Sequence, residues 1–178
     1  MRREFRTGLF FGIFAALAIA LYCFWLWEGE RQVARHTENL FRRIEQKKWS
    51  GLANLIADDY RDQWNNDRGL LLERMRLVLG AVRDFRINAT DIDIECKIDN
   101  GTGGNRAPST GKPGRIGVWR GKILIEIGDA EFGAVVKEQI NSLTAPFELQ
   151  WRCVSGKPWD WKLIRVSNPD LEIPKGFD

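Results

Sequence analysis

Apolar positions in the first half of the chain beyond residue 28 recur with the period of a helix. Three successive stretches place their apolar residues on one side while Glu, Arg, Gln and Lys occupy the other, which predicts three amphipathic helices. Ser50 is placed to cap the short second helix, and the third follows Asp67. The apolar residues that support them are Val33, Leu40, Phe41 and Ile44; Leu52, Leu55 and Ile56; and Leu71, Leu72, Met75, Val78, Leu79 and Val82.

The second half of the chain changes to the two-residue period of a strand. Charged and apolar residues alternate from Asp91 to Ile98, which predicts a half-buried strand. Upstream, Phe85 and Ile87 have the opposite parity. If both segments form one strand, an extra residue near Thr90 must shift the register as a β-bulge does. That strand is expected to be long and bent.

The C-terminal part predicts a hairpin. Residues 147–153 alternate cleanly between apolar and polar, residues 155–158 have the composition of a turn, and Trp159, Trp161 and Leu163 continue the alternation. On these strands and the preceding ones we expect apolar side chains to face inward. The expected inward positions are Phe85, Ile87, Ala89, Ile92, Ile94, Cys96, Ile98, Phe147, Leu149, Trp151, Cys153, Trp159, Trp161 and Leu163.

Between these strands lie three less regular segments. Residues 99–114 are rich in glycine and nearly free of apolar side chains, which predicts a flexible hairpin loop. Residues 116–127 predict a further strand, in which Gly121 either forms a bulge or turns a tight hairpin. Residues 129–143 fit a helix capped by Asp129 or an irregular strand, and we favour the helix. The order of elements predicts an α+β fold.

The N-terminus carries an uncharged run of twenty residues, 8–27, long enough to cross a bilayer as a helix. Arg2, Arg3 and Arg6 precede it, which favours a cytoplasmic N-terminus and an exported C-terminal domain. The alternative is a cleaved signal peptide, with Ala18 and Ala20 as its cleavage signal. We expect a basic tail at 1–7, a transmembrane helix at 8–27, one domain at 28–166 and a C-terminal tail at 167–178.

The charges that remain after residue 28 exclude one class of partner. The chain has 27 basic and 24 acidic residues, and removing those before residue 28 leaves 24 and 23. A nearly neutral domain lacks the clustered cations that nucleic-acid binding requires. We therefore expect no nucleic-acid partner, but a bilayer contacted through residues 8–27 and either a membrane-complex protein or a small apolar ligand. A homodimer through the sheet is a further expectation.

The order of helix, short helix, helix and curved antiparallel sheet resembles the nuclear transport factor 2-like superfamily, also called SnoaL-like or cystatin-like cone folds. The resemblance is carried by KKWSGLANLIADDYRDQW at 47–64 and FELQWRCVSGKPWDWKLIRV at 147–166. It implies helices packed on the concave side of a strongly bent sheet around a cavity. The topology also resembles the scaffold subunit of type IV secretion systems, although that family's NPxG-like motif is replaced by NPDL at 168–171.

Candidate chemistry is sparse. Asp58, Asp59 and Tyr60 are the candidates for acid–base catalysis, and the alternative interpretation places the two acids on the solvent side of a helix end. His36 is expected on the polar side of the first helix, and no ligand spacing suggests a metal or a cofactor. Cys96 and Cys153 are expected as free thiols, with a disulfide as the alternative. The candidate ligand-binding residues are Trp64, Trp151 and Trp161.

These observations favour one function and leave a second open. We expect a single-pass protein of a bacterial inner membrane, with a non-enzymatic periplasmic domain that binds a partner protein or a small apolar ligand. The alternative is a SnoaL-like isomerase or hydrolyase acting on an apolar molecule within the cone. Asp58, Asp59 or Tyr60 would then carry the chemistry.

Overall fold

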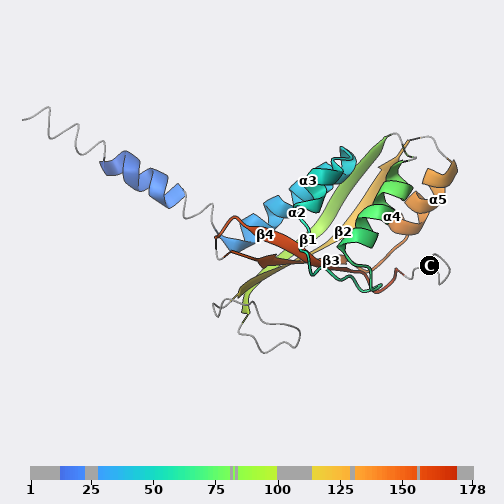
Figure 1. Ribbon diagram of the computed structural model, residues 1–178. Helices are drawn as coiled ribbons and strands as arrows, with labels where there is room; N and C mark the ends of the chain where they lie inside the picture. Colours follow the sequence, from blue (N-terminus) through green and yellow to red (C-terminus); the bar gives the residue numbers. More distant parts are fainter. Residues whose placement is uncertain are drawn as a thin grey trace, which may run out of the picture.

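The computed structural model describes residues 13–22, 28–80, 82, 84–99, 114–128, 131–155 and 157–171. Four helices and four strands follow residue 28 in chain order (Figure 1). They are α2 (Gly29–Glu45), α3 (Trp49–Ala53), α4 (Arg68–Gly80), β1 (Phe85–Asp99), β2 (Gly114–Ile127), α5 (Glu131–Asn141), β3 (Phe147–Cys153) and β4 (Trp161–Ser167). The predicted α+β fold is confirmed.

The helices predicted after residue 28 all form, with one local correction. The amide of Leu70 donates to the carboxylate of Asp67, which therefore caps the start of α4, the helix predicted to follow it. The cap predicted at Ser50 is wrong, because α3 begins at Trp49 and its capping position is Lys48, whose side chain makes no capping bond. The segment favoured as a helix forms α5, while Asp129 lies outside the described residues.

The four strands form one antiparallel sheet in the order β1-β2-β3-β4. The bulge predicted in β1 is confirmed: the register with β2 shifts between Thr90 and Asp93, and Asp91 has a φ of 52°. Strand β2 runs through Gly121 without turning. The loop expected at 99–114 connects β1 to β2 as a hairpin, and residues 100–113 of it lie outside the described part of the chain.

The core lies between the helices and one face of the sheet. Figure 1 shows α2, α3 and α4 beside the long strands β1 and β2. Side chains from α2, from α3 and the residues after it, and from β2, β3 and β4 are buried together there. The largest fully buried ones are Trp119, Trp151, Trp161, Tyr60, Leu52, Leu163 and Val33. Three residues expected to face inward are instead more than half exposed: Ile92, Ile98 and Trp159.

The other face of the sheet carries charges. Arg120 on β2 donates from Nε to a carboxylate oxygen of Glu148 at 2.9 Å. Its Nη1 lies 3.6 Å from a carboxylate oxygen of Asp93 and 3.6 Å from one of Glu95. The neighbouring Lys97, with a smaller effect from Arg120, lowers the pKa of Glu95. The carboxylate of Glu148 is the main cause that raises the pKa of Arg120. The outer face is therefore a solvated, ion-paired surface.

The packed structure continues beyond residue 166, where the C-terminal tail was predicted to begin. Asn168 is fully buried; its side chain donates to the carbonyl of Ala145 and accepts from the amides of Asp170 and Leu171. Gln63 completes the attachment by bonding to the Asn168 backbone. Residues 168–171 thus belong to the domain, and 172–178 lie outside the described residues.

The predicted transmembrane run is described only in part. Residues 13–22 are helical, whereas 8–12 and 23–27, like the predicted basic tail 1–7, lie outside the described residues. Among the helices that the structure describes, none has both the length and the apolar character needed to cross a bilayer.

Candidate functional site

A cavity of about 420 Å³ lies between the helices and the concave face of the sheet. Its wall is almost wholly apolar, with contributions from every helix and every strand of the domain. The lining residues from the helices include Leu40, Phe41, Ile44, Leu71, Met75, Val78 and Ile140, and those from the strands include Ile87, Ile123, Ile125, Phe147, Leu149, Leu163 and Val166. This is the place where the cone resemblance implied a cavity.

The segment between α3 and α4 supplies most of the polar groups near this cavity, and Arg74 of α4 adds a guanidinium group to the lining. It runs along β4 and bonds to it through the backbone: Leu163 donates to Leu55 at 2.8 Å, and Ala57 donates back to Leu163 at 2.9 Å. Residues 61 and 63 continue the pairing with Ile164 and Val166. This alignment fixes which side chains of the segment point into the domain and which point to solvent.

Tyr60 lies on the inner side of this segment. Its side chain is 1% exposed and lines the cavity, and its hydroxyl has no hydrogen-bond partner among the described residues. Burial raises the pKa of Tyr60 far above its ordinary value, and the nearby charge of Asp62 adds to the effect. The phenol therefore remains protonated across the physiological range.

Asp62 is a buried carboxylate at the cavity wall that the sequence pattern did not single out. One of its oxygens accepts from the amides of Trp64 and Asn66, at 3.0 and 2.8 Å, and the other accepts from the Asn66 side chain at 2.8 Å. These bonds close a tight loop in which Asn65 has a φ of 64°. The pattern of Asp, Asn and Asn in a polar stretch was the available signal, and it indicates a turn.

The three tryptophans predicted to bind ligand occupy two different environments. Trp64 lines the cavity, where its indole nitrogen donates to the carbonyl of Leu171 at 2.9 Å. Trp151 and Trp161 are fully buried in the core but are outside the set of residues that lines the cavity. Trp161 donates to the carbonyl of Pro158, and Trp151 packs beside His36 at 5.8 Å between ring centroids.

His36 is not on a solvated helix face as expected. Its Nε2 lies 3.1 Å from the carbonyl of Trp159, and burial lowers its pKa against the opposing effect of that carbonyl. Neither its Nδ1 nor the indole nitrogen of Trp151 has a partner among the described residues. The histidine therefore belongs to the packing of α2 against the β3–β4 turn.

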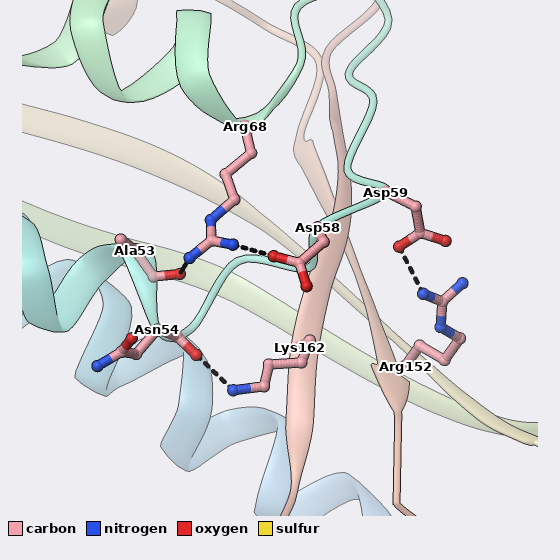
Figure 2. Close-up of polar contacts among 7 residues, drawn as sticks. All are labelled: Ala53, Asn54, Asp58, Asp59, Arg68, Arg152 and Lys162. Atoms are coloured by element: carbon pink, nitrogen blue, oxygen red, sulfur yellow. Dashed lines mark hydrogen bonds and ion pairs between the residues drawn. The ribbon is translucent and has the colours of Figure 1, made fainter.

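Asp58 and Asp59 face away from the cavity into a separate surface hollow of about 370 Å³ (Figure 2). Arg68 donates to Asp58 and to the carbonyl of Ala53, and Arg152 donates to Asp59 at 2.6 Å. The bond from Arg152 lowers the pKa of Asp59. The predicted catalytic trio is therefore divided, with Tyr60 inside the domain and the two acids outside it in ion pairs.

Lys162 completes the polar lining of this hollow. Its ammonium group donates to the carbonyl of Asn54 at 2.5 Å, as Figure 2 shows. Each of the three cations is thus engaged with an acid or a backbone carbonyl at the junction of α3, α4, β3 and β4. The arrangement ties these elements together, and Asp58 itself is mostly exposed.

The described residues contain no cluster of three or more His, Cys, Asp or Glu side chains that could hold a metal ion. Cys96 and Cys153 are both free thiols. Burial raises the pKa of Cys96 to about 11, so it is not an activated nucleophile.

No protein-family model and no curated protein matches the chain. Solved structures are similar to it. The helical cell shape determining protein Pgp2 from Campylobacter jejuni has a TM-score of 0.51 and 8% identity, covering 77% of this chain and 40% of its own. Bd1075 of Bdellovibrio bacteriovorus has a TM-score of 0.50 with the same identity and the same two coverages.

A nuclear transport factor 2-like (NTF2-like) protein of unknown function from Pseudomonas putida is also similar, with a TM-score of 0.46 and 11% identity. It covers 77% of this chain and 82% of its own length. At identities this low the similarity is one of fold alone. Proteins of the superfamily that the sequence resembles are thus among the structures similar to this chain.

Proposed function

We propose that this chain is a single-pass membrane protein whose exported domain, of the cone type, binds a small apolar molecule between its helices and its sheet. The observation that carries the proposal is the cavity of about 420 Å³ with an almost wholly apolar wall. Cavities that hold small ligands have volumes of about 300–1,000 Å³ and predominantly hydrophobic walls. The volume and lining of this cavity fit that description.

The polar groups at the wall limit the class of ligand. Asp62 and the indole of Trp64 already bond within the protein, and a ligand that displaced those bonds would leave buried groups without partners. Tyr60 contributes a ring and a hydroxyl that is buried and unpartnered among the described residues. The favoured ligand is therefore an apolar molecule with few or no charged groups.

Binding is favoured over catalysis for two reasons. A general acid or base needs a pKa near the working pH, and burial moves the pKa of Tyr60 in the wrong direction for a base. Asp58 and Asp59 lie in a different hollow and cannot reach a molecule in the cavity. An isomerase or hydrolyase using these three residues together is consequently the less supported function.

The membrane location rests on the uncharged run at 8–27. Helix α2 begins at Gly29, two residues after Trp27. Two residues extend over at most about 7 Å, so the domain would begin at the bilayer surface. An apolar ligand partitions into the same bilayer, which makes a cavity held near it a reasonable place of capture.

The test is ligand binding by the full-length protein in lipid nanodiscs. The neutral probe N-phenyl-1-naphthylamine would be titrated, with empty nanodiscs subtracted. We expect saturable binding that is lost in Met75→Trp, whose larger side chain fills the cavity. Leu77→Trp is the matched control, because Leu77 is 77% exposed on the same helix. Equal binding by the Met75→Trp and Leu77→Trp variants, or no saturable binding by the original protein, would refute the proposal.

A further inference from the structure

The two edges of the sheet differ in how they are covered. The edge of β4 is covered by residues 55–63, which bond to it through the backbone. Strand β1 forms the other edge and is the longest strand of the domain. An uncovered edge strand presents unpaired N–H and C=O groups that can pair with another chain. The edge of β1 is therefore the candidate for such pairing.

Helix α2 covers only the first half of that edge. At its C-terminus Glu45 accepts from the outward-pointing amide of Ile87 at 2.8 Å. Toward its N-terminus the helix lies one strand further in, because Val33 packs directly over Gly117 on β2. The helix crosses the inner face of the sheet obliquely. Beyond the bulge at Thr90–Asp93 its Gly29 packs against Cys96 on that face, but among the described residues no residue of α2 bonds to the edge backbone of 92–98.

The open half of the edge, Ile92–Ile98, combines free backbone groups with exposed apolar side chains. The pairing with β2 places Ile94 opposite Trp119 and Cys96 opposite Gly117. The amide of Ile87, which is opposite Ile125 on β2, points to the edge, and, except at the bulge, every second residue of β2 from Ile125 to Arg115 is opposite a residue of β1 with the same orientation. The backbone groups of Ile94, Cys96 and Ile98 therefore point to the open edge, where no partner lies among the described residues. Ile92 and Ile98 are 54% and 65% exposed.

The side chains of this segment are complementary to those of a second copy running antiparallel. If Glu95 lies on a two-fold axis, Ile92 faces Ile98 of the second copy, and Asp93 faces its Lys97. Both exposed isoleucines are then covered, and the two pairs of opposite charge lie on the outer face. Within each copy Lys97 lies 2.9 Å and Arg120 3.6 Å from the carboxylate of Glu95, and these contacts offset the repulsion between the two Glu95 side chains at the axis.

We propose that the chain forms a homodimer by antiparallel pairing of the open edges, residues 92–98 of β1, across a two-fold axis at Glu95. The outer face of the sheet is a poor alternative, because its charged groups pair with one another and would lose water on contact. This inference rests on the edge geometry and does not depend on the proposed ligand or on the membrane location.

Disulfide crosslinking of the full-length protein tests the register. In a variant with Cys23, Cys96 and Cys153 replaced by alanine, Glu95→Cys places two thiols opposite each other at a non-hydrogen-bonded pair, where Cα atoms are about 4.5 Å apart. The unfractionated lysate of cells that express the variant would be oxidised with copper phenanthroline, and the protein would be detected on a non-reducing gel. We expect most of the Glu95→Cys protein to become a covalent dimer.

Two single-cysteine controls define the specificity. Arg86→Cys lies exposed on the same strand but outside the open edge, so it should remain monomeric. Lys97→Cys should also remain monomeric, because four residues, about 13 Å, separate its two copies in this register. Crosslinking of Glu95→Cys no greater than that of Arg86→Cys would overturn the proposed dimer. Crosslinking at Lys97→Cys in its place would overturn the register.

A second readout separates edge pairing from chance collision. Ile98→Lys in the Glu95→Cys protein places a charge where apolar contact is proposed, and it should reduce the dimer several-fold. Leu77→Lys is the matched control, since Leu77 is an exposed apolar residue on α4, away from the edge. Equal crosslinking in the two variants would contradict pairing through Ile98.

Discussion

At the scale of single residues, Gly117 determines how closely α2 approaches the sheet. A Cβ atom at this position would lie 2.2 Å from Cγ2 of Val33 and 3.3 Å from both Trp161 and Cys96. These four positions belong to four different elements, α2, β1, β2 and β4, which meet at this point. Only the smallest residue lets helix and sheet pack together here.

Replacement of this glycine should destabilise the domain. We expect Gly117→Ala to lower the free energy of unfolding by about 1–3 kcal/mol, the usual cost of an extra methyl group in a filled core. Denaturant unfolding followed by tryptophan fluorescence measures it. Gly80→Ala is the control, because nothing lies within 4 Å of its added methyl group, and it should not destabilise. Equal effects of the two substitutions would contradict this account of Gly117.

The site residues predicted from the sequence agree only in part with those that line the cavity. Of the residues that the sequence singled out, Trp64 and Tyr60 line the cavity. The adjacent acids do not, because pairing of residues 55–63 with β4 directs Asp58 and Asp59 outward. The alternative interpretation of the sequence placed these two acids on the solvent side, where the structure has them. The pairing that directs them there joins residues more than a hundred positions apart.

At the scale of elements, the segment 168–171 is held to the loop before β3 by Asp170. Its carboxylate accepts from the hydroxyl of Thr144 at 2.7 Å and from the amides of Thr144 and Ala145 at 3.0 and 2.7 Å. These bonds, led by the one from Ala145, lower the pKa of Asp170. The ionised carboxylate is therefore the form that holds this segment in place.

This attachment should weaken in acid. The pKa of Asp170 is lower in the folded than in the unfolded protein. The stability that its hydrogen bonds contribute is therefore full at neutral pH and is lost as the pH falls through the pKa of the folded state. We expect Asp170→Asn to have a lower Tm than the original protein at pH 7. The difference between the two Tm values should become smaller below about pH 4. Glu138→Gln, at an exposed position on α5, is the control. A constant difference in Tm at all pH values would contradict the prediction.

Local patterns predicted most elements, and their failures have both local and tertiary causes. The change of parity in β1 indicated the bulge because side-chain alternation is set within the strand. The cap at Ser50 failed because the turn at Lys47, with a φ of 53°, begins α3 one residue earlier. The exposure of Ile92 and Ile98 was not predictable, because it depends on where α2 crosses the sheet.

At the scale of the whole molecule, the proposed membrane segment and the proposed dimer place consistent demands on the chain. Gly29, the first residue of α2, packs against Cys96, next to the proposed two-fold axis. An axis perpendicular to the joined sheets carries both α2 helices to the same face. The two membrane segments that precede these helices would thus lie on the same side of the dimer, as insertion into one bilayer requires.

The membrane segment makes its own prediction. Arginine at the centre of a transmembrane helix costs about 2.5–3.5 kcal/mol on insertion, so Leu17→Arg should move the protein from carbonate-resistant membranes toward the soluble fraction. Leu77→Arg, on exposed α4, should leave it in the membrane. Protease added to intact spheroplasts then reports whether the domain is exported. Release of the original protein by carbonate would contradict a membrane anchor.

The sequence by itself determined the α+β class, the order of helices and strands, the bulge in β1 and the near neutrality of residues 28–178, because these follow from periodicity and composition within short stretches. Only the tertiary structure decided the cavity, the separation of Tyr60 from Asp58 and Asp59, and the open edge at 92–98. Each of these depends on how distant elements cross and pair. Local periodicity describes one element at a time and therefore does not contain that information.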